Sequence, residues 1–91
     1  MWRLNPKSSL HYRHWGNEWV VFDVGSGQTH EMDTVAAATL MHCENGWISL
    51  TDLVTGVTAD LELEIGDALA ATLLPLLNHF AAREMLEYRA Q

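Results

Sequence analysis

The sequence predicts an α+β fold in which a three-stranded antiparallel meander precedes three helices. Between Leu10 and Met32, short runs rich in aromatic and branched side chains have the length and composition of strands. Two turn signals, Gly16-Asn17 and Gly25-Ser26-Gly27, separate these runs at the spacing of hairpins. After Asp33, apolar residues recur every three or four positions, as they do in helices that face a core. The sheet is therefore expected to come before the helices.

The expected strands follow a lead-in over residues 1–8 that we expect to be loosely held. The strands are Leu10–Trp15, Trp19–Asp23 and Gln28–Met32. Alternation of side chains across each strand predicts a core face of six residues, namely Leu10, Tyr12, Val20, Phe22, His30 and Met32. The middle run is apolar on both faces, which suits a central strand. Trp19 then falls on the outer face, where it is a candidate for a protein contact.

The third strand is polar at Gln28, Thr29 and Glu31, which suits an unpaired sheet edge. Such an edge offers backbone N–H and C=O groups to an extended chain. His30 shares the core side of this strand with Met32. Its ring either hydrogen-bonds a guest peptide or a helix, or is satisfied by a backbone carbonyl as in an ordinary core histidine.

The first helix is expected from Thr34 to Glu44, with Asp33 at its N-cap and Asn45-Gly46 as a left-handed C-terminal signal. Its buried side is expected to carry Val35, Ala38 or Thr39, and Met41 or His42. The segment Ser49-Leu50-Thr51-Asp52 resembles a capping box, and it predicts a short second helix that ends near Gly56.

The third helix is expected to be the longest, from Leu63 to Ala82. Its apolar stripe contains Ile65, Leu69, Leu73, Leu76 with Leu77, and Phe80. Pro75 lies inside this stripe and lacks an amide proton, so a kink or a break is expected near Ala71. Met85 and Leu86 are expected to fold back and close the core.

Length and charge limit the functions open to the chain. Its 91 residues, 48% of them hydrophobic, predict one folded domain, residues 1–91, too small for a deep catalytic chamber. Five Lys and Arg stand against twelve Asp and Glu, which gives a formal net charge of −7. Nucleic-acid binding needs clustered cations, so nucleic acid is not expected as a partner. A neutral or basic peptide would be favoured electrostatically.

Cysteine usage and hydropathy bear on the compartment. Cys43 is the single cysteine, so neither an internal disulfide nor an oxidising compartment is implied. The N-terminal residues lack an apolar core of signal-peptide length. No run approaches the roughly 18 apolar residues of a membrane span. We therefore expect a cytoplasmic protein without a membrane partner.

Histidine and cysteine spacing predicts neither a metal site nor a catalytic site. His11 and His14 are three apart on a strand and face opposite sides, whereas His42 and Cys43 diverge on a helix. No pair has the spacing of zinc ligands, so no metal and no other cofactor is expected. Cys43 is interpreted as a small buried thiol. The glycines of the second turn lack the pattern of a phosphate or dinucleotide loop.

Several segments of the sequence resemble one known family. They are Trp15–Val24, Gly27-Gln28-Thr29-His30-Glu31-Met32, the alanine-rich helix after Asp33, Ser49-Leu50-Thr51-Asp52-Leu53, and Leu73–Leu86. Together they cover nearly the whole chain and are similar to PqqD, the peptide chaperone of pyrroloquinoline quinone biosynthesis. The similarity is greatest to the branch associated with an HPr-kinase-related protein. The Gly-x-Thr-His-x-hydrophobic motif is moderately specific to this family.

The resemblance implies the winged-helix-like fold of a precursor-peptide recognition element, and a role without catalysis. Such a domain binds the leader part of a ribosomally made peptide and presents it to a peptide-modifying or HPr-kinase-related enzyme. The peptide adds as a strand to the third strand, in a groove walled by the third helix. The binding residues implied here are Gln28, Thr29, His30, Glu31, Met32, Leu74, Leu77, Asn78 and Ala81. One departure is Arg83-Glu84 before Met85-Leu86, where the family usually carries Gly-Leu.

Two other functions fit the same outline. A winged-helix transcription factor needs a basic recognition helix, and the acidic surface expected around the third helix argues against DNA binding. An interaction or dimerisation domain would pair the same edge with a second copy and give a homodimer. Sedimentation at several concentrations distinguishes self-pairing from peptide capture.

Overall fold

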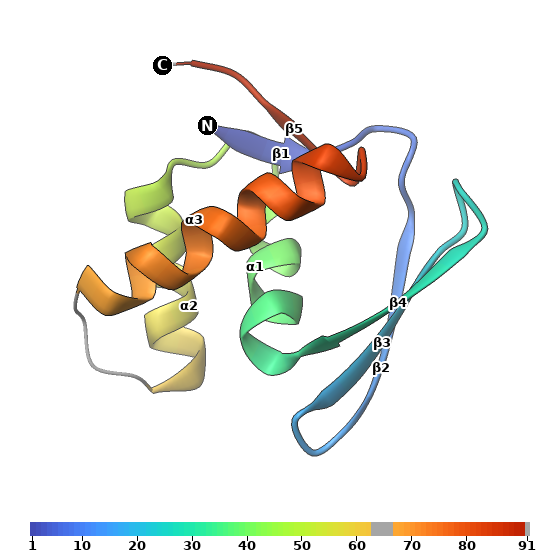
Figure 1. Cartoon of the computed structure of the whole chain (residues 1–91), viewed down its shortest axis with the longest axis horizontal. Coiled ribbons are helices and arrows are strands. Elements are labelled where there is room, and N and C mark those ends of the chain that lie inside the picture. Colours follow the sequence, from blue (N-terminus) through green and yellow to red (C-terminus); the bar gives the residue numbers. More distant parts are fainter. Residues whose placement is uncertain (63–66, 91) are drawn as a thin grey trace.

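The structure is a computed structural model that describes residues 1–62 and 67–90 (Figure 1). Along the chain the elements are β1 (Trp2–Leu4), β2 (Leu10–Trp15), β3 (Glu18–Asp23), β4 (Gln28–Asp33), α1 (Thr34–Cys43), α2 (Leu50–Leu61), α3 (Asp67–Ala82) and β5 (Leu86–Tyr88). Strands β2, β3 and β4 form an antiparallel sheet in sequence order, and β1 pairs with β5 in a separate sheet. The predicted α+β fold, a three-stranded meander followed by three helices, is confirmed.

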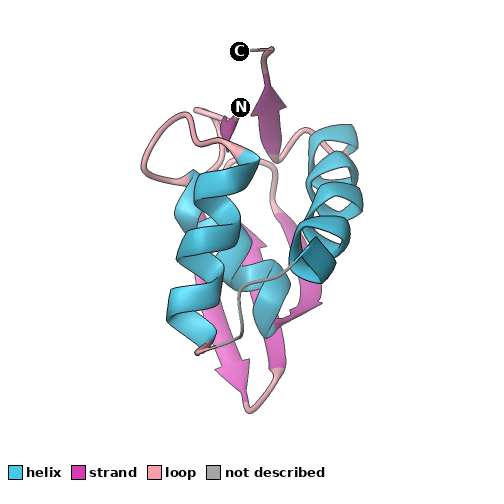
Figure 2. Cartoon of the chain, turned by 90° about the vertical axis from the view of Figure 1, so that its left-hand side faces the viewer, coloured by secondary structure: helices cyan, strands magenta, loops and turns pink. Residues whose placement is uncertain are grey.

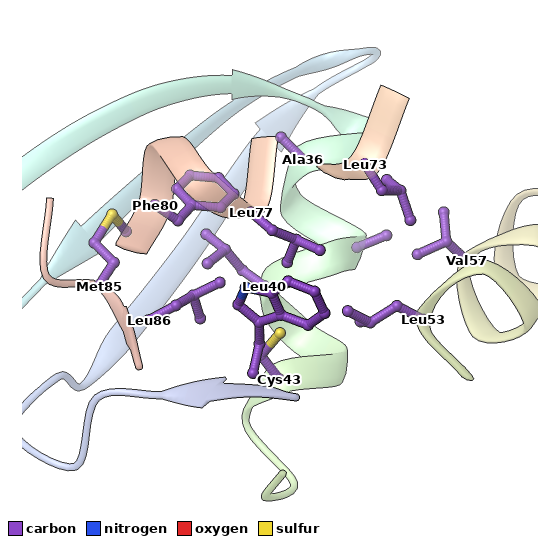
Figure 3. Close-up of a cluster of buried hydrophobic side chains, with 12 residues drawn as sticks. Ala36, Leu40, Cys43, Leu53, Val57, Leu73, Leu77, Phe80, Met85 and Leu86 are labelled. Carbon is purple, nitrogen blue, oxygen red and sulfur yellow. The ribbon is translucent and has the colours of Figure 1, made fainter. Parts of the chain in front are cut away.

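The three helices gather on one side of the β2–β3–β4 sheet (Figure 2). Figure 3 shows their buried side chains meeting around Leu40 of α1, together with Met85 and Leu86 from the C-terminal segment. Met85 and Leu86 are both almost fully buried, as expected for a segment that folds back onto the core. Within the described residues, no helix combines the length and apolar character needed to cross a membrane.

The middle strand faces the core with the opposite set of residues from the one predicted. Val21 is fully buried, whereas Phe22 is 41% exposed. The register explains this, because Val21 lies opposite Tyr12 on β2 and His30 on β4. The prediction that Val20 and Phe22 face inward was therefore wrong. A strand that is apolar on both faces gives no alternation from which its phase could be read.

Trp19 consequently lies on the inner face, which corrects its expected place on the outer face. Its indole Nε1 donates a hydrogen bond to Thr34 Oγ1 at 2.9 Å. Its ring stacks on the His14 imidazole, with 4.3 Å between the ring centroids. The tryptophan therefore fastens the sheet to the first turn of α1.

The first eight residues are not a loose lead-in. β1 pairs with β5 from Trp2 opposite Tyr88 to Leu4 opposite Leu86. Trp2 is only 7% exposed, and its backbone exchanges two hydrogen bonds with Ile48, at 2.9 and 2.8 Å. Three strand residues are too few to show a period, so this pairing of distant segments left no signal in the sequence.

Both predicted N-caps are confirmed. The Asp33 carboxylate accepts from the Ala36 N–H at 2.9 Å, and the Ser49 hydroxyl accepts from the Asp52 N–H at 3.1 Å. Helix α1 ends at Cys43, within one residue of the expectation.

Helix α2 continues through Gly56 to Leu61, so its predicted end near Gly56 was wrong. A Cβ at Gly56 would come within 2.7 Å of the His42 ring of α1. The glycine therefore permits two helices to approach closely and does not end one. His42 Nε2 also lies 2.6 Å from Asp60 Oδ2, which ties α1 to the last turn of α2.

Helix α3 continues through Pro75 without a break. The interrupted hydrogen bond and ring clash cost about 3 kcal/mol. Burial of Leu73, Leu77 and Phe80 outweighs this cost at roughly 1.5–3 kcal/mol for each side chain. The predicted start at Leu63 and the stripe residue Ile65 lie outside the described residues.

Candidate functional site

Strand β4 is an edge of the three-stranded sheet. Within the described residues it pairs with β3 alone, and β5 pairs with β1 instead of covering it. An unpaired edge presents N–H and C=O groups that can accept another strand. The edge expected at Gln28–Met32 is therefore open to a second chain.

The hydrogen-bond pattern identifies which β4 groups face outward. The Val24 N–H donates to the Ser9 carbonyl at 2.9 Å, which fixes the phase of the β2–β3 ladder. Bonded and non-bonded pairs alternate in an antiparallel ladder, so Val21 directs its backbone groups towards β4 and bonds His30. Thr29 and Glu31 then direct their N–H and C=O groups away from the sheet.

A hollow of about 460 Å³ lies between β4 and α3. We call it the β4–α3 groove. It is lined by Thr29, His30, Glu31, Met32 and Asp33 of β4, by Ala36 of α1, and by Leu76, His79, Phe80 and Arg83 along and just beyond α3. Four of the five β4 residues expected at the site line this groove, and Gln28 lines the adjoining hollow at the start of the strand.

The helix side of the groove differs from the prediction. Leu77 is fully buried in the core and Leu74 is 41% exposed, and neither lines the groove. Asn78 and Ala81 do not line it either. The residues that do line it have the spacing i, i+3, i+4 and i+7 and thus share one helix face, beginning at Leu76 and ending at Arg83.

This phase was present in the sequence, because Leu76 and Phe80 already belonged to the predicted apolar stripe. Three residues after Phe80, the same helix face reaches Arg83. Arg83 was not among the site residues predicted from the sequence. The resemblance pointed one helical position away, to Leu77, which the core occupies.

His30 points into the region between the sheet and the helices. Its Nε2 atom is buried and has no hydrogen-bond partner among the described residues. A buried polar nitrogen without a partner costs about 1–3 kcal/mol. One of the two interpretations left open by the sequence was a histidine satisfied by a backbone carbonyl. In the structure no backbone carbonyl of the described residues accepts from His30 Nε2.

The end of α3 places Arg83 at the groove. The Glu84 N–H donates to the Ala81 carbonyl at 3.0 Å, and Glu84 adopts a left-handed conformation with φ of 63°. This is the position of the departure from the resembled family, and the backbone there has the conformation that glycine favours. Asn5 Nδ2 donates to the Glu84 carbonyl at 2.9 Å and anchors the turn from the other side.

Two other reactive groups, the Cys43 thiol and the Tyr12 hydroxyl, lie outside the β4–α3 groove. Burial, with a smaller contribution from the charge of Glu44, raises the pKa of the Cys43 thiol to about 12. Burial also raises the pKa of Tyr12, whose hydroxyl donates to Glu44 Oε2 at 3.3 Å. Within the part of the chain that is described, no three His, Cys, Asp or Glu side chains are grouped to hold a metal ion.

Comparisons with known proteins add one structural match. No protein-family model matches the sequence, and neither does any curated protein. The solved structure of TbiB1 in complex with the TbiA(beta) leader peptide has a similar fold, with a TM-score of 0.67. The match covers 98% of this chain and 99% of that chain, at 19% sequence identity. At this identity the match establishes a shared fold.

Proposed function

We propose that this chain is a non-catalytic peptide-binding protein that takes up an extended segment of a precursor peptide as an added strand along β4. The observation that carries the proposal is the outward direction of the Thr29 and Glu31 backbone groups beside the β4–α3 groove. The fold shared with TbiB1, a protein solved with a leader peptide, supports a leader segment as the guest. The resemblance to PqqD-like chaperones points the same way.

The energetics require both the edge and the groove. Thr29 and Glu31 offer two N–H and two C=O groups, each worth about 1 kcal/mol net in a hydrogen bond. Ordering a flexible peptide costs about 2–5 kcal/mol or more. The backbone bonds alone therefore leave little affinity. Apolar side chains of the guest that enter the groove against Met32, Leu76 and Phe80 must supply the rest, and a micromolar complex, about −8 kcal/mol, is expected.

In this proposal the bound peptide is presented to a peptide-modifying or HPr-kinase-related enzyme, and the chain itself does no chemistry. The high pKa of Cys43 supports this, because only the thiolate is a nucleophile. Self-pairing of β4 between two copies would use the same backbone groups. It is the competing occupant of the edge.

An amide chemical-shift titration tests the proposal. The probes are synthetic peptides that span the leader segments of short open reading frames encoded next to this protein. We expect shifts confined to Thr29–Asp33 and to the α3 face from Leu76 to Arg83. Shifts centred on β2, or none with any of the peptides, would reject peptide capture at β4. Sedimentation of the free protein at several concentrations identifies self-pairing, which predicts a dimer that Glu31→Pro dissociates.

A further inference from the structure

The charges around the β4–α3 groove do not follow the net charge of the chain. Glu31 borders the groove, but by strand alternation its side chain starts from the outer face of the sheet, which it shares with Val20. The Asp33 carboxylate is occupied by the N-cap of α1. Among the residues that line the groove, Arg83 is the one with a permanent positive charge.

Arg83 has no carboxylate partner among the described residues. The ion pairs within residues 1–62 and 67–90 are Arg3 with Glu87 and His42 with Asp60. A guanidinium presents several donors in a planar fork that fits a carboxylate through two parallel hydrogen bonds. Such a group beside an open strand edge is able to pair with an acidic side chain of a second chain.

The position of Arg83 also indicates where along β4 the acidic side chain of a bound peptide would lie. It lines a second, adjoining hollow together with Lys7, Ser26 and Gln28, so it stands near the start of β4. Two carboxylates also line this second hollow. Asp23 is buried and accepts hydrogen bonds from Ser8, Ser9 and Gly25, whereas Glu84 is exposed.

His30 supplies the second contact. His30 lines the groove that Arg83 also lines, and its Nε2, on the inward face of β4, is buried without a partner among the described residues. In the tautomer with its proton on Nε2, the imidazole donates a hydrogen bond. A carboxylate reaching between these two residues would satisfy the buried nitrogen and the guanidinium together.

We propose that the β4–α3 groove selects an extended segment with an Asp or Glu side chain that points inward opposite Gln28–His30, where it pairs with Arg83 and accepts from His30 Nε2. This inference rests on the proposed function and specifies its guest. It reverses the expectation of a neutral or basic peptide that the net charge gave. The other end of the groove, at Met32, Leu76 and Phe80, takes a large apolar side chain of the same segment.

A spacing rule follows from the strand geometry. Successive side chains of a strand point to opposite faces, so two residues that both enter the groove are separated by an even number of positions. The acidic and the apolar residue of the guest must therefore lie two or four positions apart. Moving the acidic residue by one position turns it away from Arg83.

The test is a selection of displayed random 12-residue peptides on the intact protein. We expect the enriched peptides to carry Asp or Glu two or four positions from a large apolar residue. Changing that residue to Asn or Gln in a synthetic copy should weaken binding about tenfold or more, as for a hydrogen-bonded charge. The same change should have little effect on binding to Arg83→Gln. Arg13→Gln, which removes an equal charge from exposed β2, is the matched control and should behave as the wild type.

His30→Phe separates the two contacts, because it keeps a ring of similar shape and removes the nitrogen. It should reduce the preference for the acidic over the amide peptide about threefold or more while leaving thermal stability equal or higher. One contrary result is that selected peptides lose affinity for Glu31→Pro but show no preference for an acidic residue. Another is that they keep the acidic preference on Arg83→Gln. Either result overturns this inference and leaves strand capture at β4 unaffected. Failure to enrich any peptide overturns both.

Discussion

Among the described residues, the β2–β3–β4 sheet has two unpaired edges, and they differ in what lies beside them. Leu10, Tyr12 and His14 on β2 direct their backbone groups outward as Thr29 and Glu31 do on β4, so both edges offer hydrogen bonds. At β4, α3 stands across a groove lined by His30 and Arg83, which lack partners among the described residues. The hollow at β2 lies over the outer face of the β2–β3 hairpin, and its lining includes no helix residue.

The comparison separates two contributions to strand capture. An edge supplies backbone bonds to any extended chain, whereas a wall supplies the side-chain contacts that give affinity and selectivity. If backbone exposure were sufficient, β2 and β4 would bind equally well. If the wall is also needed, β4 binds the peptide and β2 remains empty.

The largest effect on stability is expected at Leu77, where α3, the helix wall of the β4–α3 groove, packs into the core. Leu77→Ala should lower the free energy of unfolding by about 2–5 kcal/mol, because the side chain is fully buried. Leu74→Ala, one turn away and 41% exposed, should change it by less than about 0.5 kcal/mol. Urea titration measures both. Equal losses would mean that α3 is oriented differently from the structure, and β4 would then lack this wall.

Proline substitutions compare the two edges directly. Glu31→Pro removes an outward amide of β4 and should weaken binding of a selected peptide about tenfold or more, since a carbonyl of the guest loses its partner and is left unpaired in the complex. His14→Pro removes the corresponding outward amide of β2 and should leave affinity within about twofold. Isothermal titration calorimetry gives both values, with circular dichroism to check folding. Similar losses in the two variants would remove the distinction between the edges.

Asp23 holds the starts of both edges in place, and its contribution depends on pH. Burial alone raises the pKa of Asp23, but hydrogen bonds from Ser9, Ser8 and Gly25 together lower it below the ordinary value. The stability it contributes is therefore complete above about pH 4 and is lost as pH falls through the lower, folded-state pKa. Asp23→Asn should cost about 1–3 kcal/mol at pH 7.

The acid range supplies the control for Asp23. Because the asparagine does not titrate, the difference in stability between Asp23→Asn and the wild type should narrow below pH 4. Thermal unfolding at pH 7 and pH 3 measures this difference. A difference that is constant with pH would contradict the role of the ionised carboxylate.

The smallest expected effect concerns the turn that positions Arg83. Glu84 has a φ of 63° and Glu62, at the end of α2, has a φ of 54°, both in the left-handed region. Replacing either with glycine should stabilise the protein by up to about 1 kcal/mol. Only Glu84→Gly lies beside the β4–α3 groove, so only this variant should also alter peptide affinity. Equal effects of the two variants on binding would show that this turn does not position the groove.

Most of the fold was predictable because local rules agree with one another in this chain. The hairpin turns, the N-caps at Asp33 and Ser49 and the strand at Gln28–Met32 are each specified by nearby residues. The failures occurred where distant contacts decide the outcome. The β1–β5 pairing joins the two ends of the chain, and Gly56 lies inside a helix because His42 packs against it.

The candidate site divides in the same way. The β4 side follows from alternation within one strand, and the residues predicted there line the β4–α3 groove or the hollow beside it. The α3 side depends on the rotation of a helix about its axis, which the core sets by burying Leu73 and Leu77. That rotation presents Leu76, Phe80 and Arg83 to β4. The unpartnered nitrogen of His30 also appears only in three dimensions.

Amide hydrogen exchange with a selected peptide tests strand capture at β4 most directly, because it reports on individual edge amides. We predict that the Thr29 and Glu31 amides, fast in the free protein, become protected in the complex, whereas those of Tyr12 and His14 keep their free rates. Protection of the β2 amides, or unchanged exchange at Thr29 and Glu31 in a saturated complex, would contradict capture at this edge.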